Sequence, residues 1–232
     1  MVGPRRASVN ATALRKSGPP GQVSRMSDPS HPSPRSVTRL FLLCHGATAA
    51  TRMAAFPVDE AIEDKASAVA AAMAGRSPAV ARVLTSPATA ARQTAAALGL
   101  TAEVEPGLRD CDYGRWAGRT LDEVSAVEPE AVFAWLSDPA AAPHGGESIA
   151  ALAGRVGDWL DSEAVQGGVL AVTHAAVMRG AVIHVLGAPM QSFWRIDVPP
   201  LALFELRRGG GPWTLRAMKL RPGPDVSADD DG

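Results

Sequence analysis

The sequence predicts an α/β fold, a three-layer sandwich with a mostly parallel central sheet. Between residues 37 and 221, short runs of apolar residues alternate with longer amphipathic segments. Runs that are apolar throughout are typical of parallel strands, because helices cover both faces of such a sheet. The alternation of these runs with helical segments is the pattern that α/β domains show.

The individual elements follow from the periodicity in each segment. Buried strands are predicted at residues 40–43, 80–84 and 169–172. Helices are predicted at residues 61–73, 88–98, 148–164 and 175–186. The stretch SFWRIDVPPLALFELRRGGGPWTLRAMKL instead indicates strands joined by a glycine-rich turn. That turn lacks the spacing of a dinucleotide-binding loop.

The chain of 232 residues fits one domain with two tails. We expect residues 37–221 to form the domain. Residues 1–36 are rich in proline, serine and arginine, which predicts a disordered basic tail, or a start upstream of a true initiator at Met26. A transit peptide is disfavoured, because the prolines and glycines interrupt any amphipathic helix. Residues 222–232 read as an acidic disordered tail.

Composition narrows the function classes. The net charge of −1 gives no argument for nucleic acid as a partner. No apolar run approaches the roughly 18 residues that a membrane helix needs, so no membrane partner is expected. The two cysteines cannot form a disulfide framework, which favours a reducing, cytoplasmic location.

Two histidines follow predicted strands. His45 comes after RLFLLC, and His174 comes after GVLAVT. Functional residues of open α/β sheets gather where strands end and helices begin, so we expect both imidazoles at one rim of the sheet. The third strand ends at Thr85-Ser86-Pro87 and opens a helix whose N-terminal N–H groups suit an anion.

Five short signatures occur in the order found in one known family. They are Leu43-Cys44-His45-Gly46, TSPATAARQTA (85–95), LRDCDYGRWAG (108–118), GGES (145–148) and VTHAAVMR (172–179). From residue 39 to about residue 206, the chain resembles the phosphoglycerate-mutase-like branch of the histidine phosphatase superfamily.

The resemblance implies a phosphatase fold, a small phosphorylated substrate, no cofactor and no metal. In the family the first histidine attacks phosphorus, the second helps to hold the phosphoryl oxygens, and a carboxylic acid protonates the leaving oxygen. These roles fall on His45, His174 and Asp110 respectively. Asp110 is one methylene shorter than the usual glutamate. Neutral imidazole is a good nucleophile near pH 7, which agrees with the first role.

Both phosphate-binding arginines of the family are replaced. Cys44 occupies the position of the first arginine, and Ala90 that of the second; Ala117 stands where many members have glutamate. Guanidinium groups match the phosphoryl oxygens on which charge spreads, so their loss removes the main anion clamps. Restoring arginine at Cys44 and Ala90 together is predicted to rebuild the anion site.

Other residues are candidates for the substrate pocket. Arg52 is the best candidate for a relocated cation, because it lies in the loop that covers the pocket in relatives. Arg109 is also a candidate, because it neighbours the acid. It is the weaker one, because an exposed arginine is the simpler interpretation of this residue. His144 is a candidate for the rim of the substrate pocket. The simpler interpretation is that it is an ordinary loop histidine. The remaining predicted substrate-binding residues are Gly46, Thr51, Glu147 and Ala175.

Other chemistries were weighed against this interpretation. Cysteine phosphatases need an arginine six positions after the cysteine, and that position after Cys44 is Ala50. Cys44 is therefore predicted to be a small filler. A metal site of His45, His174 and Asp110 has suitable ligand types, but the resemblance disfavours it. Three functions stay open: a phosphatase with an atypical anion pocket, a catalytically inactive binding protein, and an enzyme acting on a non-phosphate substrate.

Overall fold

The computed structural model describes residue 3 and residues 37–162 and 164–216. Every element described below belongs to one compact unit, Arg35–Gly232. The expectations for residues 1–36 and 222–232, and for the end of the domain at 217–221, lie outside the described residues. No helix among the described residues is long and apolar enough to span a bilayer.

A six-stranded sheet forms the centre of the domain, in the order β3-β2-β4-β1-β5-β6. Strands β1, β2, β3 and β4 run parallel to one another, whereas β5 is antiparallel to β1 and to β6. The predicted mostly parallel α/β fold is thus confirmed. The strand bounds are β1 Thr38–Cys44, β2 Arg82–Thr85, β3 Glu103–Val104, β4 Gly168–Thr173, β5 Leu203–Arg208 and β6 Thr214–Arg216.

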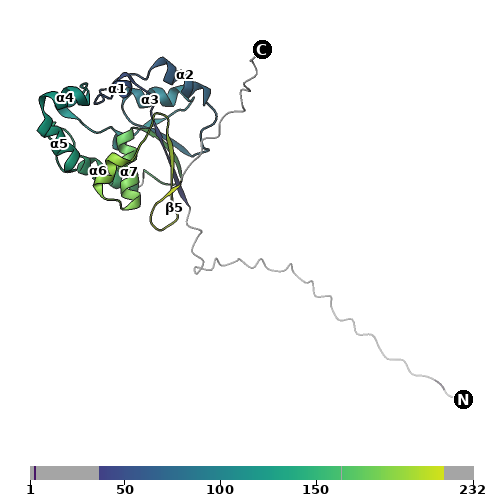
Figure 1. The fold of residues 1–232 in the computed structure, drawn as a ribbon. Coiled ribbons are helices and arrows are strands. Elements are labelled where there is room, and N and C mark those ends of the chain that lie inside the picture. The colour runs from purple at the N-terminus through teal and green to yellow at the C-terminus, as the bar shows by residue number, and fades with distance from the viewer. Residues whose placement is uncertain (1–2, 4–36, 163, 217–232) are drawn as a thin grey trace, which may run out of the picture. The chain divides into compact units, whose positions relative to one another are not determined.

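Helices cover both faces of the sheet, which makes three layers (Figure 1). One face of the sheet packs on α2 and α3, and the other packs on α6 and α7. The short helices α4 and α5 lie beside α6 in Figure 1. The helix bounds are α1 Ala49–Met53, α2 Asp64–Ala72, α3 Thr89–Ala97, α4 Leu121–Val127, α5 Pro129–Ser137, α6 Ile149–Asp161 and α7 Ala175–Leu186. Three 3-10 helices span Pro106–Leu108, Gly114–Trp116 and Met190–Arg195.

Strand β1 is apolar from Leu40 onward because both of its faces are buried there. Leu40, Leu42 and Cys44 pack with residues of α6 and α7, whereas Phe41 and Leu43 pack with α2 and α3. Successive side chains on a strand point to opposite faces, so a strand between two helical layers needs apolar residues at every position.

One expectation for the C-terminal part is wrong in detail. Residues 192–195, expected to begin a strand, belong to the 3-10 helix Met190–Arg195. Pro189 precedes that helix, and the guanidinium of Arg179 donates to the carbonyl of Ile196 at its end. The β5–β6 hairpin with its glycine-rich turn is as predicted.

Candidate active site

The two histidines meet at the carboxyl edge of the sheet, as the sequence predicted. Strands β1 and β4 are parallel neighbours, with Cys44 opposite Thr173, so the residue after each strand reaches the same rim. The backbone N–H of His45 donates to the carbonyl of Thr173 over 2.9 Å. The ring centroids of His45 and His174 are 5.0 Å apart, in an edge-to-face arrangement.

A backbone hydrogen bond defines the protonation of the His45 ring. Its Nδ1 lies 2.7 Å from the carbonyl oxygen of Gly46. A carbonyl oxygen can only accept, so Nδ1 carries a proton, and in the neutral ring the lone pair is on Nε2. Gly46 is held in turn, because its N–H donates to the hydroxyl of Thr94 on α3 over 2.9 Å.

His174 is almost fully buried at the N-terminus of α7, with 4% of its surface exposed. Burial lowers the pKa of His174, and the nearby charge of Asp110 opposes that shift. The ring is therefore neutral at pH 7. Its Nδ1 lies 3.3 Å from Oδ2 of Asp110, so the proposed acid adjoins the histidine pair.

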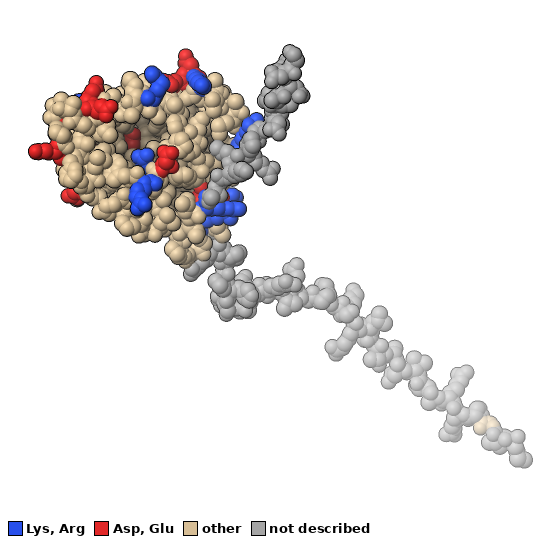
Figure 2. Space-filling view, in the orientation of Figure 1, with Lys and Arg blue, Asp and Glu red and all other residues tan. Residues whose placement is uncertain are grey.

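A pocket of about 190 Å³ opens beside the histidines. The three carboxylates that line it belong to Asp59, Glu60 and Asp110, and no lysine or arginine is among the described lining residues. The domain face in Figure 2 is hollowed, with acidic atoms visible inside the hollow. Residues lining the pocket are His45, Thr48, Pro57, Val58, Asp59, Glu60, Ala88, Ala90, Asp110, Cys111 and His174.

The two positions of the lost arginines differ in the structure. Ala90, on α3, lines the pocket, so its replacement leaves room beside the histidines. Cys44 does not line the pocket; it is 3% exposed and belongs to the core formed with α6 and α7. The prediction that Cys44 fills space is consistent with this position.

Burial raises the pKa of Cys44 to about 12, with a further contribution from the Asp110 charge, and it also raises the pKa of Cys111. The thiolate is the reactive form of cysteine, so both groups are unreactive thiols near neutrality. We expect native protein at pH 8 to resist iodoacetamide, and denatured protein to be alkylated at both positions. Intact-protein mass spectrometry measures this, and fast alkylation of the native protein would contradict the assignment.

The structure does not place Arg52 in the pocket. Its guanidinium pairs with Glu63 at 2.8 Å, and 65% of its side chain is exposed to solvent. The neighbouring Thr51 bonds with Thr48 in the capping box of α1 and is not a lining residue either. In this arrangement neither residue lines the pocket beside His45.

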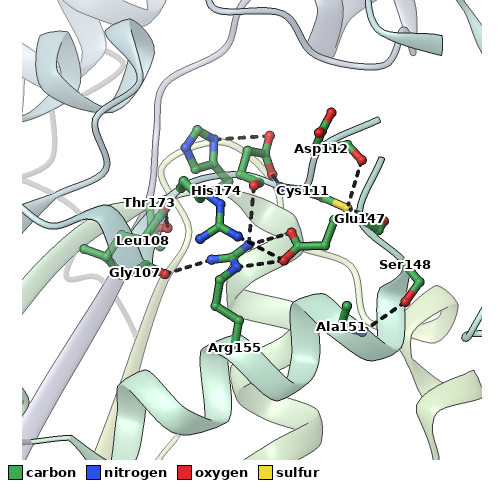
Figure 3. A network of polar contacts seen from close by, with 12 residues as sticks. Gly107, Leu108, Cys111, Asp112, Glu147, Ser148, Ala151, Arg155, Thr173 and His174 are labelled. Carbon is green, nitrogen blue, oxygen red and sulfur yellow. Dashed lines mark hydrogen bonds and ion pairs between the residues drawn. The ribbon is translucent and has the colours of Figure 1, made fainter. Parts of the chain in front are cut away.

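Glu147 has a structural contact instead of a pocket contact. Its carboxylate forms a two-pronged ion pair with Arg155 of α6, with both N–O distances at 2.8 Å. Arg155 also donates to the carbonyls of Gly107 and Asp110, at 2.9 and 3.4 Å (Figure 3). This network ties the loop that carries the proposed acid to α6. Arg109, the weaker candidate for a relocated cation, points to the same carboxylate at 3.3 Å.

Three further predicted pocket residues, Gly46, His144 and Ala175, do not line the pocket either. His144 is 1% exposed and packs against the rings of Tyr113 and Trp116, while its Nδ1 accepts from the N–H of Gly146. Its burial lowers the pKa of His144, so the ring is neutral. The ordinary structural interpretation of this histidine is the one that the geometry supports. Ala175 begins α7 and does not line the pocket.

Three polar lining residues were not found from the sequence. Thr48 is the N-cap of α1. The T-x-x-T spacing of Thr48 and Thr51 is a sequence signal for such a cap. Asp59 accepts from the N–H of Thr89 at 2.7 Å, which lowers the pKa of Asp59. Glu60 accepts from the N–H of Ala50 at 2.9 Å. Both acids lie in an irregular loop, where periodicity gives no orientation.

The described residues contain no group of three or more histidine, cysteine or acidic side chains arranged to hold a metal ion. The polar groups that line the pocket include the two imidazoles, the three carboxylates and the hydroxyl of Thr48.

Comparison with known proteins places these features in a family. The chain is 32% identical over 136 residues to a glucosyl-3-phosphoglycerate phosphatase of Mycobacterium tuberculosis, covering 56% of this chain and 59% of that protein. It is 33% identical over 178 residues to the protein of the same name from Mycolicibacterium vanbaalenii, covering 68% of this chain and 78% of that one.

A solved structure of a mycobacterial glucosyl-3-phosphoglycerate phosphatase with VO3 is also similar. Its TM-score is 0.65 and its identity 26%, with 77% of this chain and 97% of that chain covered. The model of the histidine phosphatase superfamily, branch 1, matches residues 40–221. The chain therefore belongs to branch 1 of the histidine phosphatase superfamily.

Proposed function

We propose that the protein is a phosphatase of a small phosphorylated metabolite, with Nε2 of His45 as the nucleophile. The observation that carries the proposal is the hydrogen bond from Nδ1 of His45 to Gly46, which in the neutral ring places the lone pair on Nε2. His45 lines the pocket beside His174 and Asp110, which are the positions of the family's second histidine and acid. The similarity to phosphatases of small metabolites supports the same reaction class.

The proposed reaction has two steps. First, the Asp110 carboxylate takes up a proton from solvent as the phosphate ester binds. Nε2 of His45 then forms a bond to phosphorus as the ester P–O bond breaks, and the leaving oxygen takes that proton from Asp110. Water then attacks phosphorus, gives a proton to Asp110 and releases inorganic phosphate, which regenerates His45. Oδ1 of Asp110 accepts from the N–H of Cys111 over 2.8 Å, which orients the carboxyl group for both transfers.

The charge of the pocket argues for slow turnover of simple phosphate esters. A phosphoryl dianion entering the pocket would meet the carboxylates of Asp59, Glu60 and Asp110 without a lysine or arginine among the described lining residues. Losing one donor to the transition state typically costs about 3 kcal/mol or more in activation free energy. We therefore expect activity on generic phosphomonoesters to be weak.

The same observation favours a second function, a binding protein that no longer hydrolyses phosphates. A pocket lined by three carboxylates and two imidazoles suits a neutral or positively charged ligand better than a dianion. The two functions differ in one measurable property. A phosphatase must bind phosphate or vanadate and form a phosphohistidine, whereas such a binding protein does neither.

The His45→Ala variant tests the phosphatase. Activity on a panel of small phosphate esters is expected to fall to background, because the other imidazole of the pocket, His174, has its Nε2 bonded to Ser86 and does not replace the nucleophile. A phosphoryl group that is acid-labile and alkali-stable should be trapped on wild type during turnover. His184→Ala is the control, because His184 lies outside the pocket and pairs with Asp161. Activity that survives in His45→Ala would overturn the assignment of the nucleophile.

A further inference from the structure

Ser86 contacts the ring of His174 on the side away from Asp110. Its Oγ lies 2.7 Å from Nε2 of His174, while Oδ2 of Asp110 lies 3.3 Å from Nδ1. The Asp110 contact is at ion-pair distance and lacks the alignment of a hydrogen bond. Polar atoms of the protein thus face both ring nitrogens.

The backbone fixes Ser86 in this position. It directly follows β2, is fully buried, and its N–H donates to the carbonyl of Val172 on the neighbouring β4 over 2.9 Å. The N–H of Ala88 donates to Oγ of Ser86 over 3.2 Å, which occupies one acceptor site of the hydroxyl. The hydroxyl proton of Ser86 remains available to the ring.

The proton positions follow from the chemistry of the three groups. An ionised carboxylate only accepts, so Nδ1 of His174 must carry a proton where it faces Asp110. Burial keeps the ring neutral, which leaves a lone pair on Nε2. The hydroxyl of Ser86 must therefore donate to Nε2. If Nε2 instead carried the proton and donated to Ser86, the lone pair of Nδ1 would face the carboxylate of Asp110.

We propose that Ser86 is a positioning residue that holds His174 as the neutral Nδ1–H tautomer, whose one N–H group is buried beside Asp110 and out of reach of a ligand. The family resemblance predicts that His174 helps to hold phosphoryl oxygens. With Nδ1 buried and Nε2 bonded to Ser86, His174 can donate to a ligand oxygen only after Nε2 is protonated or the ring is released. The resting pocket then lacks this anion contact as well as both arginines.

The wild-type protein provides the first test. Long-range 15N–1H spectra of the histidines at pH 7.5 distinguish protonated from unprotonated ring nitrogens, and a His174→Gln variant identifies the His174 signals. We expect Nδ1 of His174 to be protonated and Nε2 to be an unprotonated acceptor. Finding Nε2 protonated in the neutral ring would overturn the proposal, whether or not the protein is a phosphatase.

The Ser86→Ala variant tests the hydroxyl itself. The 15N shift of Nε2 in His174 should move toward that of an acceptor without a donor. Thr85→Val is the matched control, because it removes a buried hydroxyl that bonds to the carbonyl of Ser86 and not to the ring. It should leave the His174 shifts unchanged. An unchanged Nε2 shift in folded Ser86→Ala would refute the role of Ser86.

A kinetic measurement deepens the test and rests on the proposed phosphatase function. Ser86→Ala frees Nε2 of His174 to become an N–H donor to a phosphoryl oxygen, so kcat should rise about tenfold with little change in KM, the equivalent of about 1.4 kcal/mol. Thr85→Val should keep wild-type kcat. A wild type without turnover would defeat the phosphatase proposal and leave the spectroscopic test of His174 intact.

Discussion

Replacing Ala90 by arginine is expected to raise the affinity for phosphate or vanadate by roughly 10- to 100-fold. Ala90 already lines the pocket beside both histidines, so a guanidinium there can reach a bound anion. Hydrogen bonds to charged groups contribute about 1.5–3 kcal/mol, and each 1.4 kcal/mol is a factor of ten in affinity. Isothermal titration with vanadate compares the variant with wild type.

The control for this prediction is Ala96→Arg, which adds the same charge at an exposed position of α3. It should bind vanadate as wild type does, because the new charge is screened by solvent. If folded Ala90→Arg binds vanadate no better than Ala96→Arg, the pocket has lost more than its guanidinium groups, and the non-phosphate functions gain support.

The structure changes the expectation for restoring both arginines. Cys44 lies in the core formed with α6 and α7, so an arginine there must displace packed apolar side chains, even though the Asp110 charge, which outweighs that of Arg179 at this position, can partly compensate the guanidinium. Forcing a larger side chain into a packed core typically costs about 1–3 kcal/mol of folding stability. The double variant should therefore be less stable than Ala90→Arg and bind vanadate no more tightly.

Glu147→Ala is expected to lower the free energy of unfolding by about 3 kcal/mol. Only 14% of the Arg155 side chain is exposed, and Glu147 neutralises it through two contacts of 2.8 Å. Removing one partner of such a pair leaves a largely buried charge, which is the costly part of the change. Urea denaturation followed by circular dichroism measures the loss.

A surface ion pair provides the comparison. Glu103 pairs with Arg82 at 2.9 Å, but 66% of the Glu103 side chain is exposed. Exposed pairs contribute about 0–1 kcal/mol, so Glu103→Ala should unfold almost as wild type does. Equal and small losses in the two variants would mean that solvent already screens Arg155. The network would then not anchor the loop that carries Asp110.

The sequence by itself determined the layers of the fold and the meeting of the two histidines. Apolar runs such as β1 are local signals, and their placement between helices follows from the periodicity of the flanking segments. Once β1 and β4 are parallel neighbours, His45 and His174 must reach the same edge. Residues 192–195 were assigned wrongly, because Pro189 and the Arg179 contact produce a 3-10 helix that no periodicity indicates.

Only the tertiary structure decided the charge of the pocket. Arg52 pairs with Glu63, Glu147 pairs with Arg155, and the carboxylates of Asp59 and Glu60 line the cavity instead. The direction of a long side chain depends on partners that are distant in the sequence. The spacing of residues within a motif carries no information about those partners. The sequence showed that two arginines were missing; the arrangement of distant loops decided that, among the described lining residues, no other cation replaces them.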